Sequence, residues 1–282
     1  MMTYHALVVE GRQRLLKAGQ GEQAAQLLMV ELCNAKEINL YMVMDEPCDP
    51  AIQTDYLEGI HEMEKGSPLG YVLGFEWFYG YRFQVNGDVL IPRPETEELV
   101  ALVLQLFDEH FGDRDQVDVF DVGTGSGAIG ISLSLEEPKM NVVASDISPE
   151  ALAIAQANNE ALDGRVTFLE GSMLEPYIER DLRCDLLVCN PPYIPSAEPM
   201  EHSVVDYEPH VALFGGEDGL KFYRQVFERA KEVCRDKAVL AFEMGYDQGD
   251  RLKALALSYF PEALVRVHKD LSGKDRMLSV EL

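Results

Sequence analysis

Apolar residues recur at helical spacing in the first quarter of the chain. They lie three or four positions apart between about Tyr4 and Tyr71, as they do along one side of a helix. Two groups show this spacing: Ala24, Ala25, Leu27, Leu28, Val30 and Leu32, and then Ile52, Tyr56, Leu57, Ile60 and Met63. Pro47 and Pro50 interrupt the pattern between the groups. We therefore predict a small all-α N-terminal domain at residues 1–73.

Aromatic and β-branched residues dominate the next segment, residues 74–90. Such residues favour strands, so this segment predicts a β-hairpin that links two domains. Asn86-Gly87 is a common hairpin turn, although it lies near the far end of the segment and could mark only that end.

Strands and helices alternate in the remaining residues, 91–282. Ile91-Pro92-Arg93-Pro94-Glu95-Thr96-Glu97 precedes a helix that we expect to run from near Glu95 to about Phe111. The predicted strands are Val117–Val122, Asn141–Ser145, Val166–Leu169, Asp185–Cys189, Ala238–Glu243, Ala263–Val267 and Arg276–Val280. This alternation is typical of an α/β domain with a parallel sheet. The last two strands flank Ser272-Gly273-Lys274-Asp275 and predict a closing antiparallel hairpin.

Composition and charge narrow the possible functions. The 282 residues are 47% hydrophobic and 26% charged, and no apolar run is long enough for a membrane span. The five cysteines form no CxxC pair, which favours a reduced, cytoplasmic protein without a zinc site. With 24 Lys and Arg against 49 Asp and Glu, the net charge of -25 argues against direct nucleic-acid binding.

A glycine-rich turn follows the first strand of the α/β domain. Gly123-Thr124-Gly125-Ser126-Gly127 lies between that strand and a helix that begins near Ala128. Glycines allow a ligand to approach the backbone closely, and the helix N-terminus offers amide donors. Asp146 ends the next strand, where a carboxylate can accept hydrogen bonds from both ribose hydroxyls. Met173, which follows Ser172, is either a residue packed on adenine or an ordinary core methionine.

Two cofactors fit this turn. Gly125, Gly127 and Gly130 satisfy GxGxxG, which by itself is weak evidence for NAD. The wider pattern, Asp121-x-Gly123-x-Gly125-x-Gly127, is similar to the first motif of S-adenosylmethionine-dependent methyltransferases. We therefore expect S-adenosyl-L-methionine as the cofactor.

Asn190-Pro191-Pro192-Tyr193 follows a predicted buried strand and points to the reaction. The lone pair of an amide or aromatic amine is delocalised, so such a nitrogen attacks a sulfonium methyl group poorly. The Asn190 side-chain oxygen and the Pro191 carbonyl could hold its N–H groups and direct the lone pair at the methyl carbon. Two prolines stiffen the loop, and Tyr193 offers a flat wall for stacking. We predict Asn190, Pro191 and Tyr193 as catalytic, Asn190–Tyr193 as substrate-binding, and Asn190 as also bordering the cofactor, with no metal.

On these motifs the chain resembles the HemK/PrmC family, the release factor glutamine methyltransferases, nearly end to end. Further matching segments are Pro68–Gly74, Ile91–Glu97, Tyr207-Glu208-Pro209, Ala212–Leu220 and Lys269–Arg276. The resemblance implies a Rossmann-like class I methyltransferase domain. It also implies that the substrate is the glutamine of the Gly-Gly-Gln motif in bacterial class I peptide chain release factors, bound at Asn190–Tyr193. The N-terminal domain would help to dock that partner. Ser172 departs from the family, which often has an acidic residue that contacts the adenine amino group there.

Three other functions remain open from the sequence. They are a ribosomal-protein glutamine methyltransferase, an adenine-N6 nucleic-acid methyltransferase, which also uses an NPPY loop, and a noncatalytic NAD- or nucleotide-binding module. Arg93 and Glu95 could shape a substrate loop or only begin a helix. Tyr207-Glu208-Pro209 could form a lid or a plain turn.

Overall fold

A computed structural model of the chain describes residues 2–198 and 206–282, and it separates into two compact units. The first unit runs to Phe75 and also includes Asp206 and Tyr207. The second begins at Glu76 and includes Glu208–Leu282. Each unit has its own hydrophobic core.

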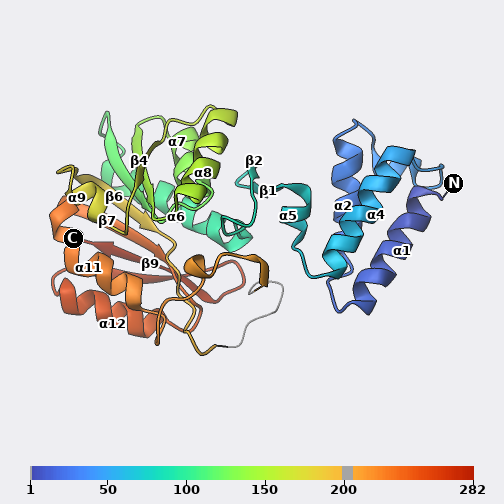
Figure 1. The fold of residues 1–282 in the computed structure, drawn as a ribbon. Coiled ribbons are helices and arrows are strands. Elements are labelled where there is room, and N and C mark those ends of the chain that lie inside the picture. Colours follow the sequence, from blue (N-terminus) through green and yellow to red (C-terminus); the bar gives the residue numbers. More distant parts are fainter. Residues whose placement is uncertain (1, 199–205) are drawn as a thin grey trace. The chain divides into compact units, whose positions relative to one another are not determined.

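The described part of the first unit is helical, as predicted. Its helices are α1 (Tyr4–Lys17), α2 (Ala24–Asn34), α3 (Leu40–Val43), α4 (Pro50–Glu64) and α5 (Leu69–Leu73). Helices α1, α2 and α4 contact one another in pairs (Figure 1). Their facing sides bury Leu7, Leu15, Leu28, Tyr56 and Ile60. This bundle confirms the predicted all-α N-terminal region, and the helical spacing of apolar residues accounts for it.

The predicted hairpin is present, with its turn at Tyr79-Gly80. Strand β1 (Phe75–Phe78) pairs with β2 (Tyr81–Gln84). Tyr79 and Gly80 have φ angles of 51° and 80°. Two successive positive φ angles suit a two-residue turn whose twist matches the strands, so Asn86-Gly87 marks only the far end of the segment. The Tyr79 amide donates to Glu97 Oε1 (2.9 Å), which fastens the turn to the next helix.

The second unit contains a seven-stranded sheet in the order β5-β4-β3-β6-β7-β9-β8. Its strands are β3 (Val117–Val122), β4 (Met140–Asp146), β5 (Thr167–Glu170), β6 (Cys184–Cys189), β7 (Cys234–Glu243), β8 (Leu264–Lys269) and β9 (Asp275–Glu281). Strands β3 to β7 pair in parallel, whereas β9 is antiparallel to both β7 and β8. The predicted parallel sheet and closing antiparallel hairpin are therefore both confirmed.

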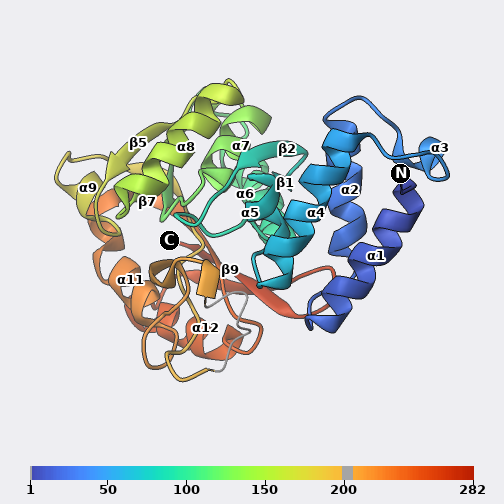
Figure 2. The same ribbon diagram turned by 45° about the vertical axis from the view of Figure 1, so that its right-hand side comes forward.

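Helices cover both faces of this sheet (Figure 2). On one side lie α6 (Pro94–Phe111), α7 (Ala128–Glu136) and α8 (Pro149–Ala161). On the other lie α9 (Glu175–Ile178), α11 (Lys221–Val233) and α12 (Gly249–Tyr259). Alternate residues of one strand face the two sides: Val119 joins the core under α6 and α7, and Phe120 joins the core under α9 and α11. Burial on both faces explains the nearly continuous apolar strands of the sequence.

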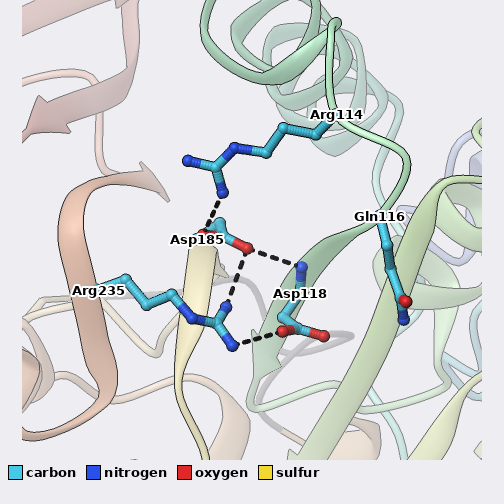
Figure 3. Close-up of a pocket in the computed structure, with 5 residues that line it drawn as sticks. All are labelled: Arg114, Gln116, Asp118, Asp185 and Arg235. Carbon is cyan, nitrogen blue, oxygen red and sulfur yellow. Dashed lines mark hydrogen bonds and ion pairs between the residues drawn. The ribbon is translucent and has the colours of Figure 1, made fainter.

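Charged residues tie together the beginnings of the three central strands (Figure 3). The Asp185 carboxylate, 5% exposed, accepts from Arg114 (2.6 Å), from Arg235 (2.9 Å) and from the Asp118 amide (3.1 Å). Arg235 also donates to the Asp118 carboxylate (2.7 Å). This cluster fixes the N-terminal edge of the sheet, so the opposite edge, where parallel strands end, is left for a ligand.

Candidate active site

The glycine turn leaves β3 at Val122 and enters α7 at Ala128. Gly123, Gly125 and Gly127 all have left-handed backbones, with φ angles of 76°, 55° and 83°. Side chains with a Cβ rarely adopt this conformation, which explains the glycine at each of the three positions. The amides of Gly123 and Thr124 both donate to the Ser145 carbonyl at 2.9 Å, so the turn is fixed against the end of β4.

Two buried polar side chains hold the turn from behind. The Asp121 carboxylate accepts from the Thr124 hydroxyl (2.6 Å) and from the Gly130 amide (2.9 Å). Burial raises the pKa of Asp121 to about 6. Asn158 on α8 donates to the Ser126 carbonyl (2.9 Å) and to the Gln84 carbonyl (3.0 Å), and it accepts from the Gln84 amide (2.7 Å). One buried amide therefore fastens both the β2 strand and the glycine turn, a role that sequence reasoning missed.

Asp146 ends β4 beside this turn, as predicted. One carboxylate oxygen accepts from the Gly125 amide (2.8 Å) and the other from the Ser148 amide (3.0 Å). These two bonds fix the direction of the carboxylate. Its remaining lone pairs are available to hydroxyl donors of a ligand.

A cavity of about 330 Å³ opens at this edge of the sheet. Its lining brings together seven residues of the predicted site: Gly123, Gly125, Asp146, Met173, Asn190, Pro191 and Pro192. Other segments contribute Asp88, Val89, Leu90, Ile147, Ser148, Ala151, Gly171, Ser172, Pro209, Val211, Ala212, Lys221, Phe222 and Gln225. A Cβ built on Gly123 or Gly125 meets no atom within 4 Å, so the bare backbone at both positions faces open space. The cavity thus leaves room for a ligand to lie directly on the glycine turn.

The apolar part of the lining is suited to a flat ring. Ile147, 56% exposed, follows Asp146, and Met173 lines the same cavity. Met173 has a left-handed backbone with φ at 48°, and Gly171, two residues earlier, has φ at 154°. A non-glycine residue in this conformation is uncommon, and such residues often occur at binding sites. Ser172 also lines the cavity, so the segment after β5 contributes both polar and apolar atoms.

The Asn190–Tyr193 segment begins where β6 ends. Two glycines of a later segment support it from behind. A Cβ on Gly215 would lie 2.6 Å from the Pro192 carbonyl oxygen, and a Cβ on Gly219 would lie 2.3 Å from the Tyr193 carbonyl oxygen. The Tyr193 carbonyl also accepts from the Gln248 side chain (2.9 Å). Close backbone packing therefore explains two of the three glycines between Ala212 and Leu220.

Four predicted site residues are not part of the cavity lining. Thr124 and Ser126 are buried, and Gly127 packs against Ile131 and Ala155. Tyr193 packs with the core on the α11 side, and its hydroxyl donates to Glu243 Oε1 (3.3 Å). Its predicted stacking on the substrate stays a prediction.

Behind Asn190 lies a buried polar group that sequence reasoning missed. Glu243, the last residue of β7, is 2% exposed, and its Oε2 accepts from the Thr96 hydroxyl of α6 (2.6 Å). Thr96 in turn accepts from Asn190 Nδ2 (3.3 Å). Burial raises the pKa of Glu243, whereas the Thr96 hydrogen bond and the Arg276 charge lower it. Burial also raises the pKa of Tyr193, and the nearby Glu243 adds to this.

The described residues contain no group of three or more His, Cys, Asp or Glu arranged to hold a metal ion. Within the same residues, no helix is long and apolar enough to cross a membrane. All five cysteines are free and buried.

Comparisons with known proteins agree with this geometry. Two family models match the chain: the PrmC N-terminal domain over residues 6–74 and the methyltransferase small domain over residues 100–206. Among solved structures, the catalytic domain of hMettl16 bound to an RNA hairpin has a TM-score of 0.53 at 14% identity, covering 82% of each chain. A methyltransferase from Pyrococcus furiosus has a TM-score of 0.52 at 16% identity, covering 72% of this chain and 89% of that one. At such identities the likeness shows the fold alone.

The fold and the matched domain define the chain as an α/β methyltransferase. The release factor glutamine methyltransferase of Bacillus anthracis is 42% identical over 95% of both chains. The enzyme of that name from Bacillus subtilis is 42% identical and covers 94% of this chain and 92% of its own. The one from Staphylococcus aureus is 34% identical and covers 99% of both chains. The chain therefore belongs to the release factor glutamine methyltransferase family.

Proposed function

We propose that this protein transfers a methyl group from S-adenosyl-L-methionine to the side-chain amide nitrogen of a glutamine. The glutamine is that of the Gly-Gly-Gln motif in bacterial class I peptide chain release factors. The relatives named for this activity match nearly the full length of the chain. One structural observation carries the proposal: Asn190 and Pro191 line the same cavity as Gly123, Gly125 and Asp146.

The cavity fits the cofactor on its own chemistry. Open space over Gly123 and Gly125 leaves room for a chain of single-bonded atoms against the turn. Asp146 would accept from the ribose hydroxyls, and Ile147 and Met173 would contact the adenine ring. The bound cofactor supplies an electrophilic methyl group on a sulfonium, which needs no metal to leave.

The residues of the chain would act on the glutamine amide. Asn190 Oδ1 and the Pro191 carbonyl would each accept one amide N–H and so fix the plane of the amide group. With the plane fixed, the nitrogen lone pair faces the reacting carbon, and the two oxygen dipoles favour the positive charge that develops on nitrogen. Pro191, which is buried, and Pro192 offer no backbone N–H that could compete for these acceptors. The methylated nitrogen then gives up its proton to water.

The partner follows from the relatives and is consistent with the charge of the chain. A net charge of -25 suits a partner that presents neutral or basic surface. We further propose that the protein acts in the cytoplasm, where its five free, buried cysteines would stay reduced.

The test combines the purified protein, methyl-labelled cofactor and an unmodified release factor, and maps the label by peptide mass spectrometry. Label on the Gly-Gly-Gln glutamine supports the proposal. Asn190→Ala should keep cofactor affinity within about two-fold and lower turnover by about two orders of magnitude or more, because only transition-state positioning is lost. Asp146→Ala should instead weaken cofactor binding. Label on ribosomal protein or on nucleic acid, with none on the release factor, would overturn the assigned substrate.

A further inference from the structure

The side-chain amide of Asn190 can adopt two orientations, with either Oδ1 or Nδ2 facing the cavity. If Oδ1 faces the cavity it can hold a substrate N–H, whereas Nδ2 in that place would repel it. The amide group is nearly symmetric in shape, so packing alone does not choose between them. The choice must come from the hydrogen bond that the other end makes.

Glu243 determines the orientation of the Asn190 amide through its hydrogen bond with Thr96. An ionised carboxylate only accepts hydrogen bonds, so the single hydroxyl hydrogen of Thr96 is committed to Glu243 Oε2 at 2.6 Å. The Thr96 oxygen can then only accept, and the amide end of Asn190 that faces it must be the donor, Nδ2, at 3.3 Å. Asn190 Oδ1 is left for the cavity that this residue lines.

The fold places these three groups together through strand register. In the parallel pair of β6 and β7, Cys189 lies opposite Phe242, so the residues that follow them, Asn190 and Glu243, lie side by side. Thr96 approaches both from the first turn of α6, and it is 4% exposed. Water therefore cannot easily replace Thr96 in this chain of hydrogen bonds.

A buried carboxylate at this place is costly to the fold unless it is compensated. Its surroundings include the Thr96 hydroxyl and the Glu95 charge from α6, the Tyr193 hydroxyl from the loop after β6, and the Arg276 charge from β9. Tyr193 donates to Oε1 while Thr96 donates to Oε2. One carboxylate thus orders both ends of the Asn190–Tyr193 segment.

We infer that Thr96 and Glu243 are positioning residues that fix the Asn190 amide with its oxygen towards the substrate nitrogen. This inference rests on the proposed function, in which Asn190 Oδ1 accepts a substrate N–H. Neither residue touches the substrate. They act only by fixing the direction of the hydrogen bond from Asn190 Nδ2 to the Thr96 oxygen.

Three substitutions separate this role from a merely structural one. Thr96→Val removes the hydroxyl but keeps the shape, and we expect about a ten-fold or greater fall in kcat, with KM and cofactor affinity within about two-fold. Thr96→Ser restores the hydroxyl and should recover most of kcat. Glu243→Gln replaces the obligate acceptor by a group that can also donate, and it should lower kcat while leaving the thermal midpoint unchanged or raised. Asp185→Asn is the matched control, since it changes a buried acid at the opposite edge of the sheet and should lower stability without changing kcat.

A readout other than activity tests the amide orientation itself. In protein labelled with 15N-asparagine, the Asn190 Nδ2 protons can be assigned by their absence in Asn190→Ala. We expect one of them to be protected from exchange in the wild type and in Thr96→Ser, and exposed in Thr96→Val. An unchanged Asn190 signal together with wild-type kcat in Thr96→Val would overturn the inference. A normal signature without methylation of the release factor would instead overturn the proposed function and leave the orientation intact.

Discussion

Replacing two glycines of the same turn by alanine should damage two different properties. Gly125 and Gly127 both have left-handed backbones, so alanine at either position carries the same conformational cost of about 1–2 kcal/mol. Their surroundings differ. A Cβ on Gly125 meets nothing within 4 Å, whereas a Cβ on Gly127 would lie 2.6 Å from Ile131 Cδ1 and 3.2 Å from Ala155 Cβ. Overpacking of this kind adds about 1–3 kcal/mol.

We therefore expect Gly125→Ala to lower the free energy of unfolding by about 1.5 kcal/mol and Gly127→Ala by about 3.5 kcal/mol. For a unit of this size these losses correspond to shifts in melting temperature of about 5 °C and about 10 °C. In cofactor affinity the order reverses. The Gly125→Ala methyl group enters the space over the turn and should weaken binding by about ten-fold or more, a loss of about 1.4 kcal/mol. Gly127, which faces the core, should affect affinity less.

Calorimetric titration of the cofactor and thermal unfolding measure the two effects separately. Trp77 is the chain's one tryptophan and lies in β1, so its fluorescence reports unfolding of the hairpin whose Phe78 and Phe83 join a core of the second unit. Unchanged cofactor affinity in Gly125→Ala would refute the placement of the ligand over the turn. Equal losses of stability in the two variants would refute the packing argument for Gly127.

Three further predictions concern residues around the cavity. Asn158→Ala removes three hydrogen bonds and should lower the free energy of unfolding by about 2–4 kcal/mol, measured by urea unfolding, and weaken cofactor binding because the Ser126 carbonyl loses its donor. Arg93→Ala leaves the buried Glu208 carboxylate without its 2.5 Å ion pair and should raise KM for the protein substrate, because Pro209, next in the chain, lines the cavity; an unchanged KM would contradict this. Since burial raises the pKa of Glu243, kcat should fall on the acid side at a pH above the usual glutamic acid range, and a pH profile of Glu243→Gln should lack that limb. The same raised pKa means that ionisation of Glu243 lowers the stability of the fold. This cost builds up as the pH rises from the usual glutamic acid pKa to the raised one, so Glu243→Gln should be no less stable than the wild type at pH 8.

Much of the fold could be predicted because helical spacing of apolar residues and short, nearly continuous apolar strands are both strong signals. Strand β3 has the predicted limits, Val117–Val122, and the other predicted strands differ from the structure mainly at their ends. The order of the strands could not be read from the sequence. Strands buried on both faces all appear as apolar runs, so nothing in the composition says which two are neighbours.

The hairpin shows how local chemistry can mislead. Asn86-Gly87 is a strong turn signal, but the turn lies at Tyr79-Gly80, where a bulky residue adopts φ 51°. Such a conformation is unfavourable for tyrosine in isolation. The hydrogen bond from its amide to Glu97 of α6 and its packing against the core supply the compensation, and neither is visible in the sequence.

The cavity lining formed by Gly123, Asp146 and Asn190 was predictable because these residues lie at the ends of parallel strands. Gly123 and Asn190 directly follow apolar runs, Asp146 follows one after a single serine, and parallel strands end at one edge. Thr96 and Glu243 are different. Thr96 stands among the glutamates of a helix start, and Glu243 is a single acid after an apolar strand, so neither position singles the residue out in the sequence. What distinguishes Glu243 is its neighbour: only when β6 and β7 are known to be adjacent does the acid that ends one strand lie beside the asparagine that ends the other. Strand order therefore has to be known before the roles of Thr96 and Glu243 can be inferred. The sequence pattern shows where the strands are but not which strands are neighbours.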